Sequence, residues 1–177
     1  MNSKAVLLFF GISGMILYSS PAETVYSTFE KASTKVFPNT IIATHNIQLS
    51  ANQVDQIEDV LEMSLPTQNV TYFEYLSENN TVGYAMVTNQ IGKHYPITFF
   101  VAMDRDYAVK DVILLVYREA YGSQVRKRRF MKQFKGKRLS DPIRVNHDIT
   151  SVSSATLSSY AIANGTRRVL AIINEVL

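Results

Sequence analysis

The residues best placed for chemistry are the hydroxyl side chains of residues 152–159, which come immediately before an apolar segment with helical spacing. At the N-terminus of a helix, the first backbone N–H groups have no intrahelical partner and face the positive end of the helix dipole. Such a helix start binds phosphate without a charged side chain. The pattern therefore favours a phosphate site in which the hydroxyl of Thr156 reaches the phosphate.

A structural interpretation of the same residues stands beside this one. Ser and Thr are the commonest residues that cap helix N-termini, and they do so by accepting a hydrogen bond from a free backbone N–H group. A run of hydroxyl residues before a helix fits a simple cap equally well. From local physics alone, both interpretations stay open.

The wording of the motif adds a resemblance. The run Ser153-Ser154-Ala155-Thr156-Leu157-Ser158-Ser159 is similar to the Ser/Thr-Gly-Ala-Thr-x-Ser/Thr-Ser signature of the FMN-binding domain family, which is found in subunits of sodium-translocating NADH:quinone reductase and Rnf-type complexes. In that family the Thr after Ala carries FMN through a phosphoester bond. The resemblance implies covalent FMN at Thr156, with the phosphate surrounded by Ser153, Ser154, Ala155, Leu157 and Ser158.

The resemblance extends upstream and covers most of Gln90 to Leu177. The segment Tyr117-Arg118-Glu119-Ala120-Tyr121-Gly122, followed by Arg129-Phe130, Gln133-Phe134 and Gly136-Lys137, looks like the family's region before the flavin loop. It implies that Glu119 and the Tyr121-Gly122 turn lie near the flavin ring. Aromatic residues at this spacing also fit an ordinary core, and Glu119 also fits a surface partner of a nearby Arg. The candidates for a wall beside the ring are Tyr117, Tyr121, Phe130 and Phe134.

Two positions depart from the family pattern. Ser154 stands where the family usually has Gly, and Thr150 stands where it has Asp, while Asp148 lies two positions too early. A Ser in place of Gly restricts a loop that needs a positive φ angle. The missing carboxylate bears on recognition by the enzyme that attaches the flavin, or by its metal ion.

The amino-acid composition limits the redox chemistry that the chain can perform. The sequence contains no Cys, which excludes a lipoprotein anchor, disulfides, thiolate metal sites and iron–sulfur ligation. His45, His94 and His147 are far apart and have no metal-ligand spacing, and no G-x-S-x-G motif presents a Ser nucleophile. Redox activity therefore requires a bound organic cofactor such as a flavin.

The N-terminus has the features of a secretory signal. Residues 1–22 contain Lys4, an apolar run from Ala5 to Tyr18, and the small-residue sequence Ser20-Pro21-Ala22. We therefore predict a signal peptide at 1–22 and an FMN-binding domain at 23–177, exported to the periplasm. An uncleaved segment that keeps the protein at the membrane is the alternative.

Between residues 23 and 177, the hydrophobic pattern predicts an α+β fold. Helical spacing occurs in the segments 24–36, 50–63, 124–134 and 155–176, and strand-like runs occur at 40–49, 70–77, 82–87, 97–103 and 109–117. We expect an antiparallel sheet of about four or five strands with helices packed on it, and a C-terminal helix that follows the flavin-attachment loop. In the helix 124–134, Val125, Phe130 and Phe134 are expected to face the sheet. In the last helix, Leu157 is expected to belong to the core.

Charge is unevenly distributed behind a net charge of +3. Acidic residues prevail from Glu23 to Leu115, and basic residues prevail from Val116 to Leu177, where most of them fall in the block 126–138. Such a block fits a solvated surface or a docking face for an acidic redox partner. Export makes nucleic acid an unsuitable partner.

Together these features predict an exported electron carrier, rather than a stand-alone enzyme, with FMN attached covalently at Thr156. The resemblance implies two partners: a flavin transferase that uses FAD and Mg²⁺, and a membrane-associated redox protein. One alternative is a flavin-free binding module whose basic face holds anionic lipid or an acidic protein. A third hypothesis, a flavin-dependent reductase, requires an open pocket over the ring.

Overall fold

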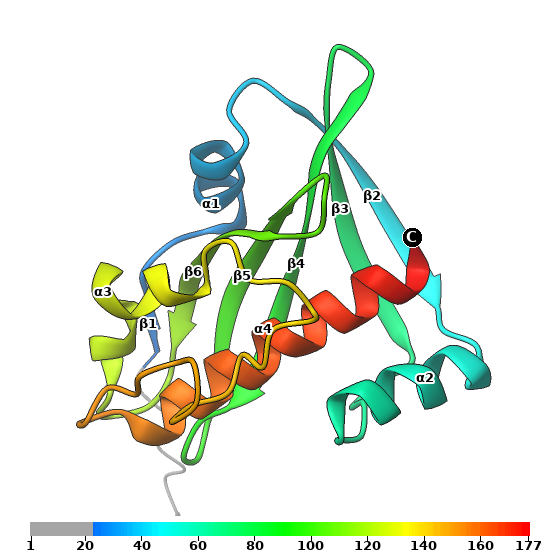
Figure 1. Ribbon diagram of the computed structural model, residues 1–177. Helices are drawn as coiled ribbons and strands as arrows, with labels where there is room; N and C mark the ends of the chain where they lie inside the picture. Colours follow the sequence, from blue (N-terminus) through cyan, green and yellow to red (C-terminus); the bar gives the residue numbers. More distant parts are fainter. Residues whose placement is uncertain (1–22) are drawn as a thin grey trace, which may run out of the picture.

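The computed structural model describes residues 23–177, so the predicted signal segment, residues 1–22, lies outside the described residues. A six-stranded antiparallel sheet forms the centre, with the strand order β1-β6-β5-β4-β3-β2. The long helix α4 crosses one face of this sheet (Figure 1). The α+β class is confirmed, with slightly more strands than predicted. The strands are β1 (Thr24–Val25), β2 (Ile41–Gln48), β3 (Asn69–Ser77), β4 (Asn80–Ile91), β5 (Pro96–Asp104) and β6 (Val109–Tyr117).

The predicted antiparallel meander is present and extends from β2 to β6. Its tightest turn joins β3 to β4 through Glu78 and Asn79, which have φ angles of 49° and 62°. Two consecutive positive φ angles match the right-handed twist of paired strands, and Asn tolerates this conformation better than most residues. β1 pairs with β6 at the edge of the sheet.

Two helices are close to their predicted bounds. Helix α2 (Ala51–Leu61) begins after a capping box formed by Ser50 and Gln53, and it ends at Glu62, whose φ is 58°. Helix α4 (Thr156–Val176) begins one residue after the predicted position. The predicted first helix is shorter: residues 24–25 form β1, and α1 (Phe29–Val36) begins after its cap, Thr28.

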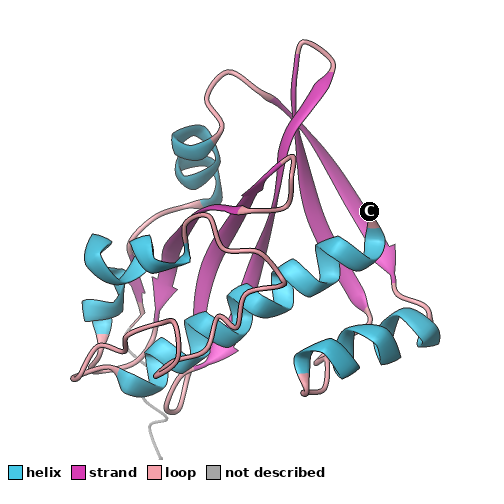
Figure 2. Cartoon of the chain, in the orientation of Figure 1, coloured by secondary structure: helices cyan, strands magenta, loops and turns pink. Residues whose placement is uncertain are grey.

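The predicted basic helix is wrong as a single element, as the short helical pieces in Figure 2 show. A 3₁₀ turn (Ser123–Arg126), the short α3 (Arg128–Met131) and a second 3₁₀ turn (Lys132–Phe134) replace it. Val125 and Phe130 are both buried, but residues five apart in one α-helix point about 140° away from each other. The extended conformation of Lys127 (φ −62°, ψ 139°) breaks the helix and lets both side chains reach the sheet.

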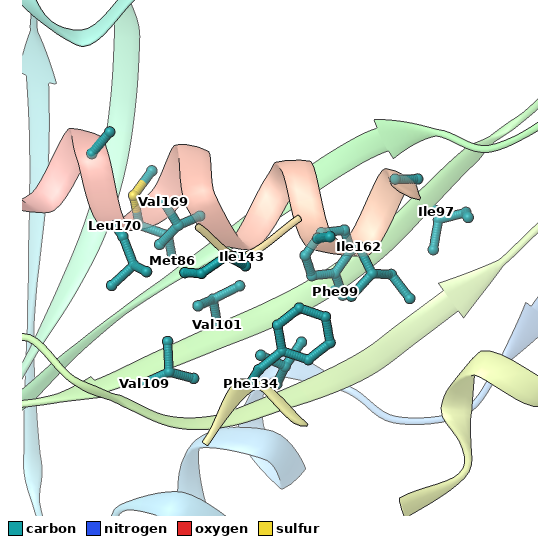
Figure 3. Close-up of a cluster of buried hydrophobic side chains, with 14 of the residues drawn as sticks. Met86, Ile97, Phe99, Val101, Val109, Phe134, Ile143, Ile162, Val169 and Leu170 are labelled. Atoms are coloured by element: carbon teal, nitrogen blue, oxygen red, sulfur yellow. The ribbon is translucent and has the colours of Figure 1, made fainter. Parts of the chain in front are cut away.

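The core lies on both faces of the sheet because strand side chains alternate. Phe99, Val101 and Met103 of β5 join the large cluster under α4, whereas Phe100 and Ala102 face the smaller cluster under α1. Figure 3 shows the large cluster, in which Ile162 and Val169 of α4 pack over the β5 side chains. Among the described residues, no helix has the length and apolar character needed to cross a membrane.

Candidate functional site

The candidate site lies where the end of β6 meets the start of α4. Three segments that are far apart in sequence come together here: the β4–β5 turn, residues 119–121, and residues 153–158. They enclose a cavity of about 420 Å³. The lining residues are Lys93, His94, Glu119, Ala120, Tyr121, Ser153, Ser154, Ala155, Thr156, Leu157 and Ser158. Every predicted cofactor residue except Gly122 therefore lines one cavity.

Helix α4 begins at the cavity with Thr156 as its first residue. The residue before it, Ala155, makes no side-chain cap, so the hydroxyl run does not cap the helix in the way that the structural alternative requires. The Ser159 N–H donates to the carbonyl of Ala155 (2.9 Å) and begins the helical ladder. Within residues 23–177, the N–H groups of Thr156, Leu157 and Ser158 have no hydrogen-bond partner. The helix start is therefore free to bind an anion.

A buried tyrosine connects the two sides of the site. The Tyr117 hydroxyl donates to the carbonyl of Tyr121 (2.6 Å) and lies 2.8 Å from the Oγ of Ser158. Burial raises the pKa of Tyr117, and the hydrogen bond with Ser158 opposes this only in part, so the phenol stays protonated at neutral pH. Tyr117 therefore fastens the 121–122 turn to the first turn of α4.

Gly122 lies directly behind this connection and not in the cavity. Its φ is +94°, a conformation that side chains rarely adopt. A Cβ atom at this position would lie 2.6 Å from the Tyr117 hydroxyl and 3.2 Å from the Cβ of Ala155. Gly122 thus permits the close approach of the turn to α4.

Two polar side chains fix the loop before Thr156. Ser159 Oγ accepts from the Val152 N–H (3.1 Å) and donates to the Ala155 carbonyl (2.9 Å). Gln133 holds Thr150 from both sides, because its amide donates to the Thr150 carbonyl (3.0 Å) and accepts from the Thr150 N–H (2.8 Å). The sequence analysis assigned no role to either residue, since their partners become apparent only after folding.

Glu119 shapes the opposite wall through backbone contacts. Its Oε1 accepts hydrogen bonds from the N–H groups of His94 (2.6 Å) and Tyr95 (2.9 Å). Burial alone would raise the pKa of Glu119, but the backbone N–H groups outweigh it and the pKa is lowered. The structural alternative, an ion pair with a nearby Arg, is not what the structure shows. Glu119 instead brings Lys93 and His94, which the sequence analysis did not assign to the site, to the cavity.

Only one of the four candidate wall aromatics is available to a ligand. Tyr117, Phe130 and Phe134 are buried in the core, whereas Tyr121 is 88% exposed at the cavity. Leu157 is 52% exposed beside it, so the prediction that Leu157 packs in the core is wrong. Position 157 falls on the face of α4 that is turned away from the sheet. The cavity mouth therefore carries two exposed apolar side chains.

The structure also clarifies the two departures from the family pattern. Ser154 is not among the described residues with positive φ, so a Ser at this position does not strain the loop. Thr150 faces a second cavity of about 680 Å³ on the other side of the loop, together with Lys127 and Arg129. Asp148 is engaged elsewhere: it pairs with Lys137 (2.8 Å) and accepts from the Arg144 N–H (2.8 Å).

Comparison with known proteins gives a family and a shared fold. Residues 92–171 match the family model described as the FMN-binding domain. No curated protein matches the sequence. Among solved structures, the NqrC protein of Shewanella oneidensis is similar with a TM-score of 0.50 and 16% identity, over 84% of this chain and 87% of that chain. The corresponding NqrC-type protein of the Na⁺-translocating NADH-quinone reductase from Parabacteroides distasonis gives a TM-score of 0.48 and 15% identity, over 81% of each chain.

Proposed function

Because residues 92–171 belong to the FMN-binding domain family, we propose that this protein is an exported electron carrier whose FMN is attached to Thr156 by a phosphoester bond. The observation that carries the proposal is the uncapped start of α4 at the cavity, with the Thr156 hydroxyl exposed on its first turn. A phosphate there receives the free N–H groups of the helix start and the positive end of its dipole.

The cavity fits FMN in its chemistry as well as its place. Its volume of about 420 Å³ is in the range of small-molecule sites, which is roughly 300–1,000 Å³. Lys93 adds positive charge on the wall opposite Thr156, which suits a phosphate. Tyr121 and Leu157 offer exposed apolar surface to one side of a planar ring.

The cofactor supplies the electron transfer, because a flavin moves one or two electrons and so bridges hydride donors and one-electron acceptors. The protein binds and orients it. Glu119 keeps its carboxylate ionised and engaged with the β4–β5 turn, so it supports the wall instead of supplying a proton. A tether at Thr156 keeps the cofactor with a protein that works outside the cell, where free flavin is scarce.

The proposal includes two partners and a place of action. A flavin transferase, using FAD and Mg²⁺, would modify Thr156, and a membrane-associated redox protein would exchange electrons with the bound flavin. Residues 1–22 would act as the export signal and leave a chain that begins at Glu23.

The test is to express the full chain with a flavin transferase, export it, and measure intact mass and flavin fluorescence after denaturation. We expect one FMN per chain in the wild type and none in Thr156→Ala. Ser153→Ala is the matched control, because Ser153 lines the same cavity and is exposed like Thr156, and it should keep the flavin. The same mass spectrum reports whether the chain begins at Glu23.

Flavin that persists in Thr156→Ala after denaturation would place the attachment on another hydroxyl. An unmodified wild-type chain, exported with an active transferase, would refute covalent attachment. In that case the flavin-free binding module becomes the better hypothesis, since the chain exposes Arg126, Lys127, Arg128 and Arg129 in one run.

A further inference from the structure

A groove of about 650 Å³ runs along the edge of β6 and shares no lining residue with the attachment cavity. Its floor is the β6 stretch Lys110–Leu114. One wall comes from α1 and the opposite wall from the segment 126–135, which contains α3. Figure 1 shows α1 and α3 on either side of the β1–β6 edge. Any ligand of this groove is therefore separate from the flavin.

The floor of the groove is an open strand edge. β1 pairs only with Val116 and Tyr117 of β6. At the other end of β6, Val109 exchanges backbone hydrogen bonds with Gly136 (2.7 Å) and Lys137 (2.8 Å). Within residues 23–177, no strand pairs with the intervening stretch on this side. An edge of this kind presents unpaired N–H and C=O groups that can accept another strand.

The groove is strongly basic. One acidic residue, Asp111, lines it, and this residue pairs with Lys35 (3.3 Å) and accepts from the Val112 N–H (2.9 Å). The Arg126 guanidinium is stacked over the ring of Tyr26, 4.9 Å from its centroid, which positions that charge at the rim. The basic lining residues are Lys35, Lys110, Arg126, Arg128, Lys132 and Lys135.

The cations stand on both sides of the strand edge. α1 packs on the sheet face that holds the smaller core cluster, whereas Phe130 and Met131 of α3 belong to the larger cluster on the other face. Successive side chains of a strand point to opposite faces of a sheet. A strand added to this edge would therefore place side chains of both orientations beside Lys or Arg.

We propose that this β6 groove binds an extended acidic segment of a partner protein, which adds to the sheet as a seventh strand. The open stretch Lys110–Leu114 accommodates about five residues at ~3.3 Å each. Backbone hydrogen bonds give the segment its register, and acidic side chains on both faces meet the two basic walls. Asp111 blocks the edge in the free protein, as inward charges do on natural edge strands.

A lipid surface explains these features less well. A flat membrane contacts protruding charges, whereas these cations line a concave groove whose floor offers backbone hydrogen bonds. The proposal goes beyond the electron-carrier function and does not depend on it, so it can be tested on the protein without flavin.

The probe is a fluorescein-labelled peptide Glu-Glu-Val-Glu-Glu, titrated with the flavin-free protein at about 0.15 M salt and followed by fluorescence anisotropy. Arg128→Glu combined with Lys132→Glu should weaken binding by about tenfold or more, because two favourable charges become repulsive. The matched control, Lys31→Glu combined with Arg105→Glu, changes the net charge equally at two exposed positions outside the groove and should bind normally. Asp111→Asn should tighten binding.

A second peptide with methyl groups on alternate backbone nitrogens keeps the charge but cannot add as a strand, and it should not bind. Equal binding of both peptides would overturn strand addition, and equal loss in the control variant would reduce the effect to net charge. Binding of phosphatidylserine vesicles through Arg128 and Lys132, without peptide binding, would assign the groove to lipid instead. Far-UV circular dichroism confirms that each variant is folded.

Discussion

At the scale of single residues, the candidate site depends on polar side chains whose partners are far away in sequence. Tyr117 contacts Ser158 across the site, and Gln133 holds the backbone of Thr150. Asp148 extends this support, because it accepts from the N–H groups of Ile143 (3.1 Å) and Arg144 (2.8 Å) and pairs with Lys137. Asp148 therefore orders the segment that leads to the flavin loop.

The role of Asp148 predicts a stability that depends on pH. Burial of the carboxylate alone would raise its pKa, but Lys137 and the backbone N–H groups outweigh it, so the pKa lies below its ordinary value of 3.8. A lowered folded-state pKa stabilises the protein above the unfolded-state pKa, and this contribution is lost as the pH falls through the folded-state value. Asp148→Asn should cost roughly 1–3 kcal/mol near pH 7.

Urea unfolding of wild type and Asp148→Asn between pH 7 and about pH 3 measures this effect. The difference between the two proteins should shrink below about pH 4, where the wild-type carboxylate becomes protonated. Asp55→Asn, at a position of α2 outside this network, is the control and should show little difference at any pH. A cost for Asp148→Asn that does not vary with pH would contradict the electrostatic explanation.

At the scale of elements, α4 both positions the site and completes the core. Its N-terminus forms the cavity wall, and its middle lies directly on the sheet over β4 and β5. The close approach occurs at Gly165, where a Cβ atom would lie 2.4 Å from the Phe99 ring and 2.7 Å from Cγ of Gln90. Arg167 adds a connection to α2 by donating to the carbonyls of Val60 (2.7 Å) and Leu61 (3.1 Å).

This contact predicts that Gly165→Ala destabilises the protein, although Ala usually favours a helix over Gly by about 1 kcal/mol. The added methyl group forces α4 away from the sheet, which should cost roughly 1–3 kcal/mol as overpacking. Asn164→Ala is the control, because the neighbouring position is only partly buried and gains helix propensity. Thermal and urea unfolding should show a loss in the first variant only, and a stabilised Gly165→Ala would refute the close contact.

At the scale of the whole molecule, the segment that matches the family and the folding unit do not coincide. The family match covers residues 92–171 and begins in the turn between β4 and β5. β4 nevertheless pairs with β5 along most of its length, and α4 packs against β4 and α2. The sheet on which the attachment loop rests therefore includes strands from outside the matched segment.

We accordingly predict that residues 92–171 alone do not fold, whereas residues 23–177 do. Without β4, the central strand β5 loses one of its two partners and α4 loses part of its apolar support. Circular dichroism and amide-proton dispersion in NMR spectra of the two fragments compare them directly. A cooperatively folded 92–171 fragment would show that the core under α4 is self-sufficient.

The sequence by itself determined the elements with strong local signals. The capping box of Ser50, the alternating and apolar runs of β3 to β6, and the C-terminal helix all follow from local patterns. The motif also identified the family and brought Thr156 forward as the attachment residue, because side-chain types and spacing are properties of the chain alone.

Tertiary structure decided what depends on contacts between distant segments. It broke the basic segment at Lys127, since Val125 and Phe130 both had to reach the sheet. It turned Glu119 toward the β4–β5 turn and brought Lys93 into the site. It also left the β6 edge open between two basic walls, because β1 is too short to cover it. Local sequence carries no record of these pairings, which arise only when the sheet and α4 pack together.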